Sequence, residues 1–97
     1  MKQGRKIVTK MDIFKKKAAV IVRTDQDENI EVSDDFQSVQ RANHGLSTHL
    51  SAIGAVTMEK AYNEHDGLKM QTLEHLPREN NRYGLIDYEV FPTSELD

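Results

Sequence analysis

The residues best suited to chemistry in this chain are carboxylates, which crowd into residues 25–35. Asp25, Asp27 and Asn29 resemble the start of an EF-hand calcium loop, where oxygen ligands stand at positions 1, 3 and 5. Position 6, however, is Ile30 where the loop needs glycine, and position 12 is Phe36 where it needs a bidentate glutamate. The pattern therefore favours a solvated hairpin turn, and it leaves open an acidic patch that docks a basic partner. That patch would comprise Asp25, Asp27, Glu28, Glu31, Asp34 and Asp35.

Basic side chains are concentrated in the N-terminal residues 1–23. Residues 1–23 hold eight bases and one acid, and residues 24–97 hold five bases and fifteen acids, which gives +7 and −10 and so the net charge of −3. A basic segment can grip a phosphate backbone, and the nucleic-acid alternative rests on it. Aromatic stacking partners are scarce, because Phe14 is the only ring among these bases. The candidate contacts are Lys10, Lys15, Lys16, Lys17 and Arg23.

The four histidines form no recognisable site. His44 and His49 are five residues apart, roughly 140° around a helix, so they do not share a face as a zinc pair would. The chain has no cysteine, and no histidine stands in a nucleophile motif. We therefore expect no metal site, no cofactor and no enzyme. A small enzyme remains an alternative only if a pocket holds His49, His65 or His75 beside a carboxylate.

One long helical segment, residues 33–66, is expected to position these groups. Ser33 and the acids after it suit a helix N-terminus, apolar residues follow at spacings of three and four, and Gly67 suits a stop. An unbroken helix from Asp34 to His65 would span ~48 Å, longer than the ~32 Å diameter of a domain of this size. Either the helix breaks at residues 43–45, or its exposed half packs on another chain. Self-association would use Asn43, Leu46, Leu50 and Ile53, but the same stripe could instead cover the chain's own sheet.

Alternating apolar residues predict strands at 6–14, 30–32, 68–76 and 83–91, and a β-branched run that is apolar on both faces predicts a central strand at 18–24. The element order is then β-β-β-α-β-β. The expected fold is a single α+β domain: an antiparallel sheet of four to five strands, packed by one long or broken helix. Its parts would be the N-terminal strands and hairpin (1–32), the helical segment (33–66), a C-terminal hairpin (67–92) and a frayed tail (93–97).

Size and composition favour binding over catalysis. A chain of 97 residues builds a modest core with little room for a deep cleft. It has no apolar run of the ~20 residues that a bilayer span needs, so we expect a cytoplasmic protein. The sequence thus predicts a small non-catalytic regulatory module that acts through protein–protein contacts, as a homodimer and as an inhibitor or adaptor.

Overall fold

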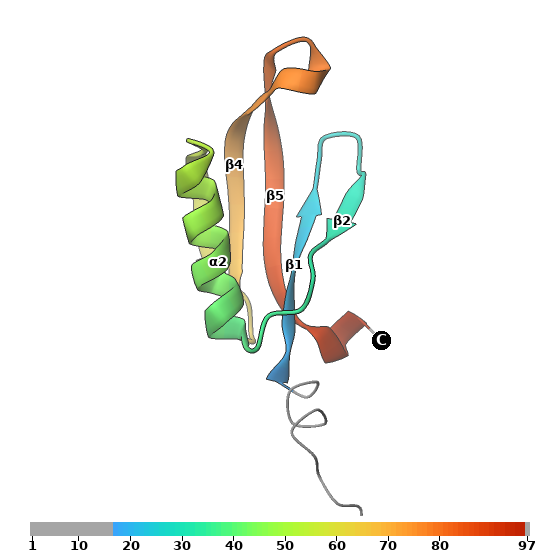
Figure 1. The fold of residues 1–97 in the computed structure, drawn as a ribbon, viewed down its shortest axis with the longest axis vertical. Coiled ribbons are helices and arrows are strands. Elements are labelled where there is room, and N and C mark those ends of the chain that lie inside the picture. Colours follow the sequence, from blue (N-terminus) through green and yellow to red (C-terminus); the bar gives the residue numbers. More distant parts are fainter. Residues whose placement is uncertain (1–16, 97) are drawn as a thin grey trace, which may run out of the picture.

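The computed structural model describes residues 17–96, which form a five-stranded antiparallel sheet with an α-helix on one face (Figure 1). The strand order is β2-β1-β5-β4-β3. This architecture confirms the predicted α+β class. The predicted strand at 6–14 lies outside the described residues. The elements are β1 (Ala19–Thr24), β2 (Ile30–Val32), α2 (Val39–Ala52), β3 (Val56–Tyr62), β4 (Leu68–Leu76) and β5 (Arg82–Pro92), with 3-10 turns η1 (Pro77–Glu79) and η2 (Thr93–Leu96).

The helix is much shorter than the predicted segment 33–66. It has 14 residues and strand β3 comes directly after it, so the order from residue 17 onward is β-β-α-β-β-β. Gly54, with a φ of 70°, ends the helix. The Gly54 N–H donates to the Ser51 carbonyl and the Ala55 N–H to the Leu50 carbonyl, which is a Schellman ending. The predicted stop at Gly67 was wrong because Gly54 already supplies the left-handed residue that closes the helix.

The helix also begins later than predicted and does not break. Ser38 is the N-cap, and its hydroxyl accepts from the Arg41 N–H at 3.1 Å, so Ser33, Asp34 and Asp35 lie in the preceding loop. The helix passes through Gly45 without interruption. A 14-residue helix spans ~21 Å, so no part of it overhangs the domain and the length argument for a second chain disappears.

The core lies between α2 and one face of the sheet. Ala42, Leu46 and Leu50 are the buried residues of the helix, and alternate residues of the strands meet them. Truncating a side chain as buried as Leu46 costs about 2–5 kcal/mol, so this layer holds the fold together. The sheet side of the core consists of Ala19, Leu68, Met70, Ile86, Tyr88 and Val90.

The C-terminal residues 93–96 are folded, which corrects the expectation of a frayed tail. The Thr93 N–H donates to the Ala18 carbonyl at 2.8 Å, and the Thr93 hydroxyl donates to Asp35 Oδ1 at 2.9 Å. These bonds hold η2 at the end of β1 and β5 (Figure 1). No helix within residues 17–96 is long and apolar enough to cross a membrane.

Candidate functional site

The face of the sheet opposite α2, called here the open face, has no α-helix over it among the described residues, and only η2 lies beside it, next to Glu89 and Phe91. Successive residues of a strand point to opposite faces, so the residues that alternate with the core lie on this side. The register places the following residues there: Val20, Val22, Thr24, Ile30, Val32, Val56, Glu59, Ala61, Lys69, Gln71, Leu73, His75, Tyr83, Leu85, Asp87, Glu89 and Phe91. Of these residues, Val20 is buried.

An apolar row crosses three strands of the open face. Val56 stands opposite Leu73, and Leu73 stands opposite Leu85. Val56 is 55% exposed and Leu85 is 40% exposed. The next pair along the strands is His75 and Tyr83, whose ring centroids are 5.3 Å apart. Adjacent apolar side chains left in water are a feature of binding surfaces, whereas scattered single ones are not.

The centre of the open face is hollowed and acidic. A shallow concavity of about 670 Å³ is lined by residues of β1, β3, β4 and β5. Three carboxylates line it, from Glu59, Asp87 and Glu89, against two ammonium groups, from Lys60 and Lys69, of which only Lys69 belongs to the open face. Gln71 Nε2 donates to Asp87 Oδ1 at 3.4 Å, and no ion pair reaches these three carboxylates from the described part of the chain.

The two edges of the sheet are poor sites for adding a strand from another molecule. β3 carries a bulge between Thr57 and Glu59, and its middle bears Glu59 and Lys60. β2 has only three residues. Bulges, charges and short length are the devices by which sheets block edge-to-edge pairing. The open face, rather than an edge, is therefore the surface available to a partner.

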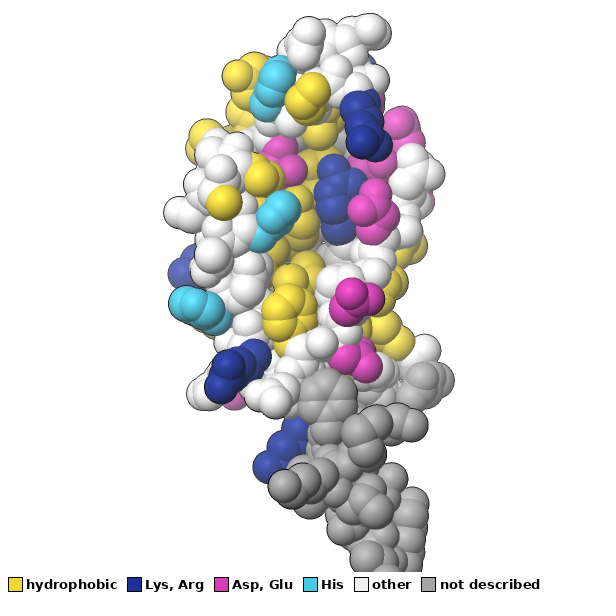
Figure 2. Space-filling view, in the orientation of Figure 1, with side chains coloured by type: hydrophobic (Ala, Val, Ile, Leu, Met, Phe, Trp, Pro, Cys, Tyr) yellow, Lys and Arg dark blue, Asp and Glu magenta, His cyan; other side chains and the backbone are white. Residues whose placement is uncertain are grey.

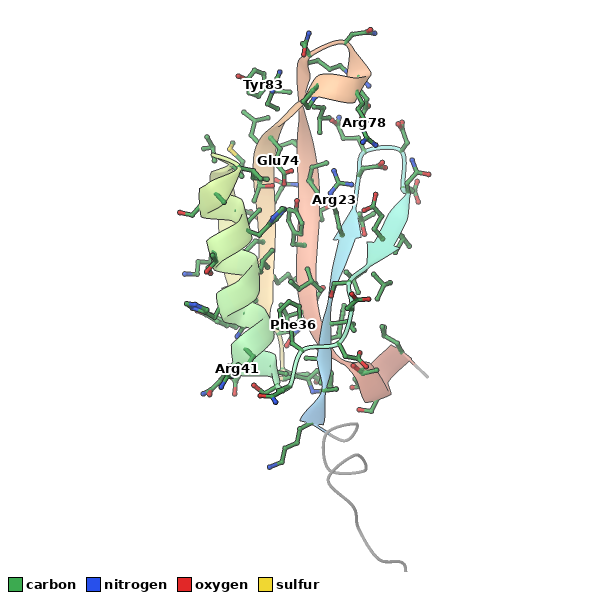
Figure 3. All side chains as sticks on the ribbon, viewed as in Figure 1. Arg23, Phe36, Arg41, Glu74, Arg78 and Tyr83 are labelled. Atoms are coloured by element: carbon green, nitrogen blue, oxygen red, sulfur yellow. The ribbon has the colours of Figure 1, made fainter. Side chains whose placement is uncertain are left out.

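A polar network lies on the other face of the sheet, which Figure 2 shows with α2 toward the viewer. Glu74 is only 6% exposed, and the Thr72 hydroxyl donates to its Oε2 at 2.7 Å. Burial raises the pKa of the Tyr88 hydroxyl, and a hydrogen bond with Glu74 raises it further. Arg23 and Glu74 lie on this face from β1 and β4, on either side of β5 (Figure 3). Because each group has a partner, the network serves to satisfy buried charge.

The six acids predicted as one patch do not lie together. Asp25, Asp27 and Glu28 lie at the tip of the β1–β2 hairpin, whereas Asp34 and Asp35 lie in the loop that leads to α2. The tip and this loop are at opposite ends of the hairpin (Figure 1). The sixth acid, Glu31, lies in β2 with its carboxylate 3.6 Å from the Arg23 guanidinium. Asp25 itself organises the turn: its Oδ1 accepts the N–H groups of Asp27 and Asn29, each at 2.9 Å. Hydrogen bonds from Asn29 lower the pKa of the Asp25 carboxyl.

The residues predicted for self-association have mostly intramolecular partners. Leu46 is 1% exposed and Leu50 is 4% exposed, because both face the chain's own sheet. Asn43 Nδ2 donates to the Asp66 carbonyl, and Asn43 Oδ1 accepts the Leu68 N–H, each at 2.9 Å. Only Ile53, 45% exposed, is directed largely to solvent. The stripe is thus core, the second of the two interpretations that the sequence left open.

Two of the five predicted nucleic-acid contacts, Lys17 and Arg23, lie among the described residues. Lys10, Lys15 and Lys16 lie outside the described residues, and Lys17 is exposed beside β1. Arg23 faces the polar network, with Nη1 at 3.6 Å from Glu31 Oε2. Burial acts to lower the pKa of Arg23, but the hydrogen bond with Tyr88 and the charges of Glu31 and Glu74 raise it overall. The Arg23 guanidinium therefore interacts with side chains of its own chain.

Within residues 17–96, His65 is the histidine that lies in a concavity beside a carboxylate, which is the condition set for the enzyme alternative. It lies in the β3–β4 turn, not at a helix end, with Glu64 and Glu95 beside it in a concavity. The residues lining that concavity include no serine, threonine or lysine that could act as a nucleophile. Sequence reasoning missed this cluster because Glu95 is thirty residues from His65.

The sequence predicted only part of the open face. The alternation in residues 83–91 separates Asp87 and Glu89 from the core side chains, which is the signal for a second, solvated face. Comparisons give no further guide, since the chain matches no family model, no curated protein and no solved structure.

Proposed function

We propose that this chain is a small non-catalytic module that binds a partner protein on the open face of its sheet. The observation that carries the proposal is the apolar row of Val56, Leu73 and Leu85 beside three carboxylates that outnumber the two ammonium groups of the concavity and form no ion pair among the described residues. Protein interfaces combine such apolar centres with charges that select the partner. The blocked edges support a contact through the face itself.

The partner that suits this surface presents a lysine or arginine flanked by apolar side chains. Its cation would enter the concavity near Glu59, Asp87 and Glu89, and its apolar groups would cover the row at Val56 and Leu85. A second copy of the chain is disfavoured as the occupant, because its own acidic concavity would face this one and the carboxylates would repel each other. A module that occupies a basic site in this way would act as an inhibitor or an adaptor.

The test compares two matched pairs of variants as immobilised baits in lysate of the native host. In the first pair, Val56→Ser with Leu85→Ser alters the open face, and Ile53→Ser with Tyr62→Ser removes apolar groups of similar exposure on the α2 side of the sheet. In the second pair, Asp87→Lys reverses charge in the concavity, and Asp27→Lys reverses it at the hairpin tip. We expect one protein to be lost from both open-face baits and retained by both controls.

Two results would overturn the proposal. If every bait retains the same proteins, the open face is not the contact surface. If light scattering gives about twice the 11.1 kDa of one chain, and the open-face variants return it to 11.1 kDa, the occupant is a second copy. Nuclear magnetic resonance spectra of each bait verify that it is folded.

A further inference from the structure

Three metal-ligating side chains converge beside the turn that joins β3 to β4. His65 Nε2 lies 2.7 Å from Glu95 Oε1 and 3.5 Å from Glu64 Oε1. The donor atoms of all three residues lie within 4.8 Å of one another. Glu95 belongs to η2, so the cluster joins the turn to the C-terminal 3-10 turn.

Asn63 fixes the backbone that presents His65. Its Oδ1 accepts the N–H groups of His65 and Gly67, each at 2.9 Å. Its Nδ2 donates to the Val90 carbonyl at 2.8 Å and to Glu89 Oε2 at 3.0 Å, which ties the turn to β5. A ligand whose backbone is already held loses less conformational freedom when a metal binds.

The cluster stands in a negatively charged hollow. A concavity of about 570 Å³ is lined by three carboxylates, from Glu64, Glu89 and Glu95, and by no lysine or arginine among the described residues. The side chain of His65 is 29% exposed and that of Glu64 is 84% exposed, which leaves space for water as a further ligand. A divalent cation would relieve the mutual repulsion of these carboxylates.

We propose that Glu64, His65 and Glu95 form a Zn²⁺ site. Tetrahedral Zn²⁺ with nitrogen and oxygen ligands at about 2.0–2.2 Å holds neighbouring donors roughly 3.4 Å apart. The His65–Glu64 separation of 3.5 Å already fits, and Glu95 would withdraw by about 0.7 Å from its 2.7 Å contact to reach the same spacing. The imidazole selects Zn²⁺ over Ca²⁺ and Mg²⁺, which prefer oxygen ligands alone. The bound ion would fasten η2 to the β3–β4 turn.

The experiment is a calorimetric titration of the untagged 97-residue chain with ZnCl₂ near neutral pH. We expect one saturable site per chain, weakened at least roughly tenfold by His65→Gln and by Glu95→Gln. His75→Gln is the matched control, because that exposed histidine pairs with Tyr83 and belongs to no such cluster, and it should leave the affinity unchanged. Zn²⁺ should also raise the melting temperature of the wild type, whereas Mg²⁺ and Ca²⁺ should not.

A nuclear magnetic resonance spectrum of the wild type tests the site without any variant. Amide resonances of residues 63–67 and 93–96 should shift on addition of Zn²⁺, and those of the helix histidines, His44 and His49, should not. Absence of saturable binding at about 100 μM Zn²⁺ would reduce the cluster to an ordinary histidine–carboxylate ion pair. Undiminished binding by the His65 variant, or shifts centred on other histidines, would show adventitious binding and overturn the site.

Discussion

The ring of Phe36 occupies the space that a side chain at position 45 would need. An ideal Cβ built on Gly45 stands 2.7 Å from Phe36 Cε2 and 3.0 Å from Cζ. Phe36 is itself held by two backbone hydrogen bonds with Ala19, at 2.7 and 3.0 Å. The loop before the helix thus places the Phe36 ring between α2 and β1 (Figure 3), and glycine at position 45 leaves the room that this ring needs.

This contact predicts that Gly45→Ala destabilises the protein even though alanine favours helix. The gain in helix propensity is about 1 kcal/mol, and overpacking costs about 1–3 kcal/mol, so we expect a net loss of about 1 kcal/mol. In a Phe36→Leu background the same change should become neutral or stabilising, since the ring is gone. Urea denaturation of the four proteins of this cycle measures the difference. Equal effects in both backgrounds would rule out the Phe36–Gly45 clash.

Asn43→Ala is expected to lower the free energy of unfolding by about 1–2 kcal/mol. The substitution removes two hydrogen bonds and leaves the N–H of the buried Leu68 without a partner, which outweighs the better helix propensity of alanine. His44→Ala, at the neighbouring exposed position, should change stability by less than about 0.5 kcal/mol. The loss should be independent of protein concentration. A loss that grows on dilution would instead place Asn43 at an interface between copies.

Tyr88 should resist ionisation until the protein unfolds. Burial and the hydrogen bond with Glu74 raise the pKa of its hydroxyl well above the usual value, although Arg23 acts in the opposite direction. The unfolded chain releases this proton near pH 10, whereas the folded chain keeps it. The contribution of the Tyr88 hydroxyl to the free energy of unfolding is therefore complete below about pH 10, and it is lost as the pH rises further. The absorbance at about 295 nm that is lost in a Tyr88→Phe variant should therefore appear only as the wild type unfolds, which circular dichroism follows in parallel. Ionisation of Tyr88 in protein that is still folded would contradict this.

Glu74→Ala should lower the free energy of unfolding more than the removal of an exposed carboxylate does. Glu74 is 6% exposed, and its loss leaves the Thr72 and Tyr88 hydroxyl groups with poorer partners and Arg23 with less compensating charge. We expect a loss of about 2–4 kcal/mol, against less than about 0.5 kcal/mol for the control Glu59→Ala on the open face. Thermal unfolding of both variants measures this. Similar melting temperatures would show that the network contributes nothing to stability.

Asp25 should contribute to stability only when it is ionised. Hydrogen bonds from Asn29 and Asp27 lower the pKa of its carboxyl below the usual value of 3.8. The folded state therefore loses this contribution as the pH falls through the lowered pKa, and it retains it fully above about pH 4. Asp25→Ala should unfold at lower urea concentration than the wild type at neutral pH, and the gap should narrow toward pH 2. Asp27→Ala, whose backbone bond to Asp25 persists, is the control.

Local sequence was sufficient for four strands. Residues 30–32, 68–76 and 83–91 were predicted nearly at their observed bounds from alternation, which depends only on which face is buried, and residues 18–24 from their β-branched apolar run. The same reasoning failed for residues 53–66. These residues were predicted as part of the helical segment 33–66, but every residue of β3 is exposed, so no burial pattern distinguished strand from helix there.

The sequence by itself determined the α+β class, the hairpin of β1 and β2, and the alternation that divides the sheet into two chemically different faces. Tertiary structure alone decided that α2 covers one face, that Leu46 and Leu50 are core, and that His65 meets Glu95 across thirty residues. The reason is physical: periodicity records how each segment meets water, whereas the pairing of distant segments depends on which surfaces the whole chain can bury together.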